Sequence, residues 1–159
     1  MKCRHCSTPL KNTFLDLGFA PPSNAYLTEE ALNFPEKYYP LKVRVCHKCW
    51  LVQTEDYAQA NELFSPDYAY FSSTSTSWLA HAMRYSELII ARLGLNESSQ
   101  VIEIASNDGY LLKNFLKAGI PCLGVEPTVG TSIAAEKIGI PVLREFFGEE
   151  IGKQLEAEG

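Results

Sequence analysis

Two pairs of cysteines are the residues whose types and spacing most directly predict chemistry in this sequence. Each pair is a C-x-x-C motif, and 39 residues separate the two pairs. Two intervening residues form a knuckle turn that lets both sulfurs converge on one cation, and two knuckles complete a closed tetrahedral site. We therefore predict one structural Zn²⁺ ion bound by Cys3, Cys6, Cys46 and Cys49. The alternatives are four unliganded core cysteines or a redox dithiol.

A second group of candidate residues occupies segment 103–109, which reads Glu-Ile-Ala-Ser-Asn-Asp-Gly. It falls at the first strand-to-helix turn, where doubly wound folds bind their nucleotide. The dinucleotide fingerprint G-x-G-x-x-G needs glycines for the backbone to reach a pyrophosphate, and Ala105 and Asn107 stand in their places. The sequence therefore disfavours NAD and FAD. S-adenosylmethionine carries no phosphate, so backbone groups and short polar side chains could bind its amino-acid end.

An acidic residue, Glu126, follows the second expected strand, 23 residues beyond Glu103. At this place in doubly wound folds a carboxylate accepts hydrogen bonds from the ribose hydroxyls. A solvated strand-end carboxylate is the alternative. Two other residues have structural interpretations: Cys122 as a small buried hydrophobe, and His81 as a core or surface residue of a long helix.

The elements of the first half must position the cysteines. A long helix between the two cysteine pairs is ruled out by Pro21, Pro22, Pro35 and Pro40. Alternating apolar and basic residues at 41–45 predict a strand that leads into the second pair and continues at 51–52. A short helix is expected near 56–64. The apolar residues of 77–93 recur at helical spacing, and Gly94 supplies a left-handed stop.

From residue 101 the pattern alternates between strands and helices, which predicts right-handed crossovers and a parallel sheet. The side chains of 106–108 can cap the first of these helices. The expected strands are 101–105, 121–125 and 140–143, and the expected helices are 109–118, 128–138 and 149–158. Three such strands amount to half of a doubly wound sheet, so we expect a truncated α/β domain.

Composition narrows the function classes. The chain of 159 residues is 46% hydrophobic and 21% charged, within the range of globular domains. Residues 1–50 carry seven Lys/Arg against four Asp/Glu, and residues 51–159 carry seven against fifteen. Four thiolates and one Zn²⁺ would bring the first part close to neutral, so we expect no nucleic-acid partner. No apolar run approaches a membrane span. Met1 leads to the cysteines without the apolar stretch of a signal peptide, so we expect a cytoplasmic protein. Disulfides do not persist in a reducing compartment, which favours the cysteines as metal ligands.

These motifs together resemble the zinc-containing sugar C-methyltransferases. The resemblance is carried by the double knuckle, the Tyr-x-Tyr-Phe-Ser-Ser stretch, Glu-Ile-Ala-Ser-Asn-Asp-Gly-Tyr-Leu and Gly-Val-Glu-Pro. It implies S-adenosylmethionine as cofactor and a nucleotide-linked keto-deoxysugar as substrate, hence a role in deoxysugar biosynthesis. It also implies a Rossmann-like methyltransferase sheet after a small zinc-binding lobe. The expected parts are the lobe at 1–52, a connector with a substrate-facing aromatic stretch at 53–76, and the long helix with half of the cofactor domain at 77–159.

The resemblance also implies roles for single residues. Segment 105–109 would hold the methionine part of the cofactor, Glu126 the ribose, and Pro127 would border the adenine. Tyr70, with Tyr68 as the alternate, would reach the sugar as a hydrogen-bonding or acid–base group; aromatic packing is the alternative. The cofactor candidates are therefore Glu103, Ala105, Ser106, Asn107, Asp108, Gly109, Glu126 and Pro127.

The family's main base, a histidine in a later domain, is expected beyond residue 159. We therefore expect this polypeptide to be an N-terminal fragment that is inactive alone. Two other functions were weighed. A zinc-ribbon protein-interaction module without catalysis remains the alternative, and a nicotinamide-dependent oxidoreductase is disfavoured by the missing glycines. An exposed edge of the sheet makes a homodimer conceivable.

Overall fold

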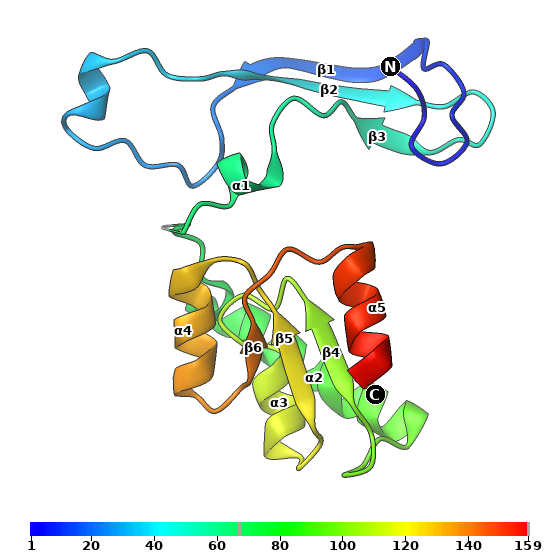
Figure 1. The fold of residues 1–159 in the computed structure, drawn as a ribbon, viewed down its shortest axis with the longest axis vertical. Coiled ribbons are helices and arrows are strands. Elements are labelled where there is room, and N and C mark those ends of the chain that lie inside the picture. The colour runs from blue at the N-terminus through cyan, green and yellow to red at the C-terminus, as the bar shows by residue number, and fades with distance from the viewer. Residues whose placement is uncertain (67, 159) are drawn as a thin grey trace. The chain divides into compact units, whose positions relative to one another are not determined.

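A computed structural model describes residues 1–66 and 68–158 of the chain. The chain divides into two compact units, Met1–Leu63 and Phe64–Gly159. The first holds an antiparallel sheet and the second a parallel sheet (Figure 1). The division falls within the expected connector, so the aromatic stretch that includes Tyr68 and Tyr70 belongs to the second unit.

The first unit is built on three antiparallel strands in the order β1-β2-β3. Their bounds are β1 Asn12–Ala20, β2 Tyr39–Val45 and β3 Val52–Thr54. The second cysteine pair lies in the turn between β2 and β3, as the alternating pattern at 41–45 predicts. A 3₁₀ helix at Ala31–Asn33 and helix α1 at Ala60–Leu63 complete this unit. Helix α1 is shorter than the helix expected at 56–64.

Strand β1 was not predicted from the sequence. Its ladder with β2 runs from the Asn12–Val45 pair to the Ala20–Tyr39 pair, but the register shifts twice on the way. At the second shift Gly18 adopts a φ of 76°, and its N–H donates to the Asp16 carboxylate at 3.0 Å. Such irregularities break the two-residue period that reveals a strand.

The second unit confirms the predicted alternation of strands and helices. Its parallel strands lie in the order β4-β5-β6. The elements are a 3₁₀ helix at Ser72–Thr74, α2 Thr76–Leu93, β4 Val101–Ile104, α3 Leu112–Lys117, β5 Cys122–Val125, α4 Val129–Lys137, β6 Val142–Leu143 and α5 Glu149–Glu158. Gly94 ends α2 with a φ of 64°, as expected. The fold is therefore α/β, with a cysteine-bearing unit followed along the chain by a partial Rossmann-like sheet.

One hydrophobic core covers a face of the parallel sheet. Right-handed crossovers between strands in sequence order place α3 and α4 on that same face. The partly buried Ile90 of α2 packs against this core. The buried members of the core are Leu112, Phe115, Ile120, Cys122, Ala135 and Ile140. Cys122 is thus the buried small hydrophobe expected, and burial raises the pKa of its thiol.

Helix α3 begins at Leu112, three residues later than the predicted start at 109. The expected caps do not serve this helix, because the side chains of Asn107 and Asp108 bond to residues 70–73 instead. Thr128 does stand at the N-cap of α4, but its hydroxyl donates to Glu126 and accepts no backbone N–H of the described helix. In both cases the polar side chains do not cap a helix. They form hydrogen bonds at the carboxyl ends of β4 and β5.

Among the described residues, each helix is too short or too polar to cross a lipid bilayer.

Candidate functional site

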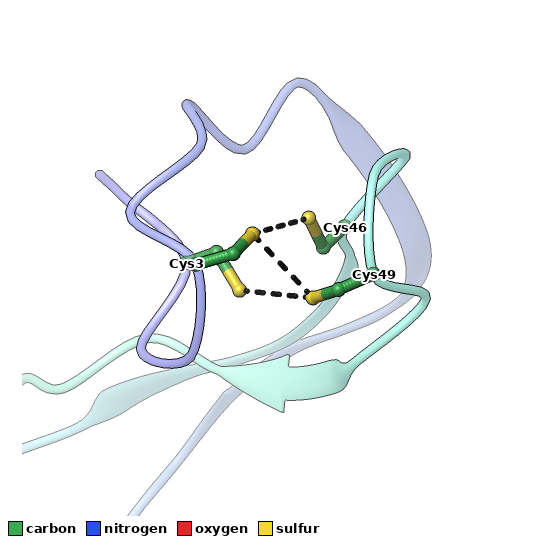
Figure 2. Close-up of side chains that lie close together, drawn as sticks. Cys3, Cys46 and Cys49 are labelled. Atoms are coloured by element: carbon green, nitrogen blue, oxygen red, sulfur yellow. Dashed lines mark hydrogen bonds between the residues drawn. The ribbon is translucent and has the colours of Figure 1, made fainter.

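Four cysteine sulfurs gather beside the sheet of the first unit (Figure 2). All four lie within 4.8 Å of one another. The Sγ of Cys49 is 3.6 Å from that of Cys3 and 3.5 Å from that of Cys6, which is 3.6 Å from that of Cys46. Four sulfurs at about 2.3 Å from one zinc ion stand about 3.8 Å apart in a tetrahedron. The cluster therefore fits the predicted Zn²⁺ site.

The two knuckles have the same backbone geometry. The N–H of Ser7 donates to the carbonyl of Cys3, and that of Trp50 donates to the carbonyl of Cys46, each at 2.9 Å. Ser7 and Trp50 are left-handed, with φ of 57° and 63°. This conformation costs a non-glycine residue about 1–2 kcal/mol. The repeated strained turn supports one role for both C-x-x-C motifs, since each turns its two sulfurs inward.

Gln53 is a member of this centre that the sequence analysis missed. It lies on β3, is 5% exposed, and its Nε2 donates to the Sγ of Cys3 at 3.3 Å. Its Oε1 accepts the backbone N–H of Arg4 at 3.0 Å. Gln53 therefore orients Cys3, a ligand of the first knuckle. Gln53 itself lies on β3, the strand that follows the second knuckle. The available signal was a polar residue four positions after Cys49, where β3 turns one side chain inward.

The thiols of Cys3 and Cys49 have pKa values shifted in opposite directions. Hydrogen bonds from the Cys6 backbone and the Gln53 side chain lower the pKa of Cys3 to about 6. Although the Leu51 backbone favours the Cys49 thiolate, burial and the neighbouring sulfurs raise the pKa of Cys49 to about 12. The thiolate of Cys49 is therefore unfavourable without a cation. This is the electrostatic condition that a bound Zn²⁺ relieves.

A cavity of about 370 Å³ lies in the second unit, at the carboxyl ends of the parallel strands. Ligands of open α/β sheets bind at this edge, and the volume is within the usual range of small-molecule sites. Its lining residues are Phe64, Tyr68, Tyr70, Ser72, Ile104, Ala105, Asn107, Tyr110, Val125, Glu126, Pro127, Glu145, Phe146 and Phe147.

Glu126 lies in the wall of this cavity and is 5% exposed. Its Oε2 accepts the backbone N–H of Asn107 at 2.9 Å. Its Oε1 accepts the backbone N–H and the hydroxyl of Thr128, at 2.9 and 2.5 Å. A carboxylate offers about four acceptor positions, so Oε2 keeps capacity for one more donor. The carboxylate is fixed in place by the chain before any ligand arrives.

The turn after β4 adopts the backbone of a glycine motif without its glycines. Ala105 and Asn107, which stand where the dinucleotide fingerprint has glycine, have φ of 58° and 51°. Asparagine tolerates this region, whereas alanine is strained there. Strain of this kind persists where the surrounding structure enforces it, commonly at binding sites.

The aromatic and hydroxyl-rich stretch is attached to this turn by hydrogen bonds. Asn107 accepts the N–H of Ser72 at 2.8 Å and donates through Nδ2 to the carbonyl of Tyr70 at 3.0 Å. The Oδ2 of Asp108 accepts the N–H of Ser73 at 3.0 Å, and also its hydroxyl. The backbone that carries Tyr70 is therefore fastened beside Glu126 as a second wall of the cavity.

Three buried side-chain oxygens lack a hydrogen-bond partner within the described part of the chain: Glu103 Oε2, Ser106 Oγ and Asp108 Oδ1. All three belong to the segment 103–109. Burial, with the charges of Asp108 and Glu126, raises the pKa of Glu103 to about 8. Buried polar atoms normally have partners, so these atoms offer hydrogen-bonding capacity to a ligand or ordered water.

Some of the predicted site residues line the cavity and others do not. Tyr68, Tyr70, Ala105, Asn107, Glu126 and Pro127 line the cavity, and Glu103, Ser106, Asp108 and Gly109 are not among its lining residues. The aromatic lining residues Tyr110, Phe146 and Phe147 were not predicted, because no spacing rule marks them in the sequence. His81 is exposed on α2 and stacks on Trp78, with ring centroids 5.2 Å apart.

Comparison with known proteins identifies the class of the first unit. Residues 3–64 match the methyltransferase-associated family Methyltransf_13, described as "Putative zinc binding domain". The matched range contains all four clustered cysteines and ends at the boundary between the two units. The first unit is therefore similar to a family described as zinc-binding, which agrees with its cluster of four cysteines.

A relative of known activity matches both units. Over 154 residues the chain is 29% identical to the C-methyltransferase NovU of Streptomyces niveus. The match covers 97% of this chain and 36% of NovU, so the chain spans about a third of that relative's length. The predicted resemblance to zinc-containing C-methyltransferases is confirmed.

Proposed function

We propose that this chain supplies the zinc-binding domain and the methyl-donor site of an S-adenosylmethionine-dependent C-methyltransferase. The observation that carries the proposal is the placement of Glu126 in one cavity with the left-handed turn at 105–107, at the carboxyl ends of β4 and β5. This edge is where nucleoside-containing ligands bind in open α/β sheets. The similarity to a C-methyltransferase supports a methyl-transfer role.

The residues present suit this cofactor. S-adenosylmethionine, when bound, would supply an electrophilic methyl group. Glu126 has one acceptor position left for a ribose hydroxyl. The turn residues Ala105 and Asn107, which line the cavity, would offer backbone groups to the amino-acid end of the cofactor. Pro127 would border the adenine, and Phe146 and Phe147 add apolar surface to the same cavity.

The proposed methyl acceptor is a carbon of a nucleotide-linked keto-deoxysugar. Tyr70 and Tyr68 line the same cavity and are the chain's candidates for a hydrogen bond to the sugar or for proton exchange with it. Phe64 contacts Tyr68 edge to face, with centroids 5.2 Å apart, which gives Tyr68 a packing role as well. Tyr70 is therefore the better candidate, because its side chain is about half exposed.

The proposed zinc ion has a structural role. The four cysteines are all engaged with one another, and a closed tetrathiolate site has no open position for substrate. Its function would be to fold the first unit, whose described residues bury few apolar side chains.

A ligand titration followed by amide NMR tests this function. S-adenosylhomocysteine, the demethylated product, should shift the amide signals of Ala105, Asn107 and Glu126 in a saturable manner. NAD⁺ at the same concentrations should leave these signals in place, because the turn lacks the pyrophosphate glycines. Saturable shifts with NAD⁺ and none with S-adenosylhomocysteine would instead support the oxidoreductase reading.

A further inference from the structure

Asn107 forms hydrogen bonds in two directions. Its backbone N–H donates to the Oε2 of Glu126 at 2.9 Å. Its side chain accepts the N–H of Ser72 at 2.8 Å and donates to the carbonyl of Tyr70 at 3.0 Å. One residue therefore connects the carboxylate on one wall of the cavity with the tyrosine-bearing backbone on the other.

The backbone of Asn107 makes this double role possible. Its φ of 51° is left-handed, a region that asparagine adopts more readily than most residues. It is 8% exposed, and its amide finds both a donor and an acceptor in the segment 70–72. Side-chain amides are well suited to bridge two backbone groups, since each carries a carbonyl and an NH₂ group.

A second attachment lies next to the first. Asp108 accepts both the N–H and the hydroxyl of Ser73 through one oxygen, Oδ2. This attachment does not touch Glu126 within the described contacts. Amide exchange at Ser73 therefore measures how rigidly the 70–73 segment is held, although Ser73 is not bonded to Asn107 in the described contacts.

We propose that Asn107 is a positioning residue that couples Glu126 to the Tyr70–Ser73 segment, so that the two walls of the cavity become ordered together. A ligand that fixes the Glu126 carboxylate then also fixes the segment carrying Tyr70, because networks of buried hydrogen bonds act cooperatively. The identity of that ligand, S-adenosylhomocysteine in the test below, rests on the proposed function. The coupling itself rests on the hydrogen bonds of Asn107.

The test measures amide hydrogen exchange at Ser73, with and without saturating S-adenosylhomocysteine. The main variant is Asn107→Gly, which keeps the left-handed backbone and the N–H to Glu126 but removes both side-chain bonds. The matched control is Asn114→Ala. Among the described residues, the Asn114 amide bonds to carbonyls of its own turn, those of Tyr110 and Leu111, and Asn114 is not a lining residue of the cavity.

In the natural chain and in Asn114→Ala, the ligand should slow exchange at Ser73 by up to about tenfold, the size expected for one net hydrogen bond. In Asn107→Gly this ligand-dependent protection should disappear at saturation. Asn107→Asp keeps the acceptor for Ser72 and should restore part of it. Equal protection of Ser73 in Asn107→Gly and in the control, at matched thermal stability, would contradict the coupling.

The ligand-free samples separate this inference from the proposed function. If the natural chain binds no S-adenosylhomocysteine, the proposed function fails, and the coupling is decided by Ser73 exchange alone. Faster exchange in both Asn107→Gly and Glu126→Gln than in Asn114→Ala would then support the coupling, since Ser73 bonds to neither residue. Exchange equal to that of the control would contradict it.

Discussion

Gly124 lies directly against Ser106, and this contact joins β5 to the turn after β4. A Cβ atom placed on Gly124 would lie 2.3 Å from the Oγ of Ser106 and 3.0 Å from its Cβ. Ser106 is fully buried, so it has no room to retreat toward solvent. The close approach fixes the segment that holds Ala105 and Asn107 at the cavity.

Gly124→Ala should therefore displace this turn. We expect a loss of about 1–3 kcal/mol in the free energy of unfolding of the second unit, the usual range for overpacking. Affinity for S-adenosylhomocysteine should fall at least about tenfold, or ~1.4 kcal/mol. Chemical denaturation and calorimetry measure the two effects. Gly148→Ala is the control, because a Cβ there meets nothing within 4 Å; equal behaviour of the two variants would show that the close approach is unimportant.

Much of the second unit could be predicted from the sequence, because its signals are local. The parallel strands are short apolar runs, although Ile102 and Ile104 of β4 are exposed, and glycines such as Gly94 mark helix ends. The start of α3 was predicted wrongly. The side chains of Asn107 and Asp108 could cap this helix, but they form hydrogen bonds with residues 70–73 instead. Only the tertiary structure shows which of these two roles the side chains take. The pairing of Gln53 with Cys3 is likewise a contact across 50 positions.

The four cysteines of the metal centre could also be predicted, but from their spacing and not from apolar patterns. Zinc coordination fixes ligand type and spacing along the chain, so a C-x-x-C motif is visible in the sequence. Strand β1 lacks such a signal, since its two register shifts disturb the side-chain alternation. The aromatic residues Phe146 and Phe147 reach the cavity from the segment after β6, where no spacing rule applies.

Removal of zinc should unfold the first unit and spare the second. Zinc binding contributes on the order of 10 kcal/mol to the folding of small metal domains, whereas the second unit has its own hydrophobic core. After chelation, verified by metal analysis, amide signals of β1, β2 and β3 should lose dispersion while those of β4, β5 and β6 remain. Unchanged signals from the first unit in metal-free protein would contradict this role.

Gln53→Ala should weaken zinc binding without removing a ligand. The change deletes the hydrogen bond from Nε2 to the Cys3 sulfur and leaves the Arg4 N–H without its acceptor. Loss of such outer partners typically lowers metal affinity about 10–100-fold, measurable by competition with a chromophoric chelator. Gln59→Ala, on an exposed residue of the same unit, is the control. Identical zinc affinities in the two variants would rule out the orienting role of Gln53.

Glu103 should make stability depend on pH. Its pKa in the folded chain is raised from 4.5 to about 8, chiefly by burial. Between these values the folded chain keeps a proton that the unfolded chain loses, so stability from this group falls as pH rises. The difference in melting temperature between Glu103→Gln and the natural chain should therefore increase from pH 5 to pH 8. A difference that stays constant, as with the exposed control Glu97→Gln, would show that Glu103 is not held protonated.

The central claim is that the cavity beside Glu126 binds the methyl donor, and calorimetric titration with S-adenosylhomocysteine tests it most directly. The natural chain should show saturable binding at one site. Glu126→Gln should lower the affinity about 10–100-fold, because an amide nitrogen would face the N–H of Asn107 or Thr128 in place of a carboxylate oxygen. Absence of binding to the natural chain, or equal affinity in a folded Glu126→Gln variant, would contradict the account.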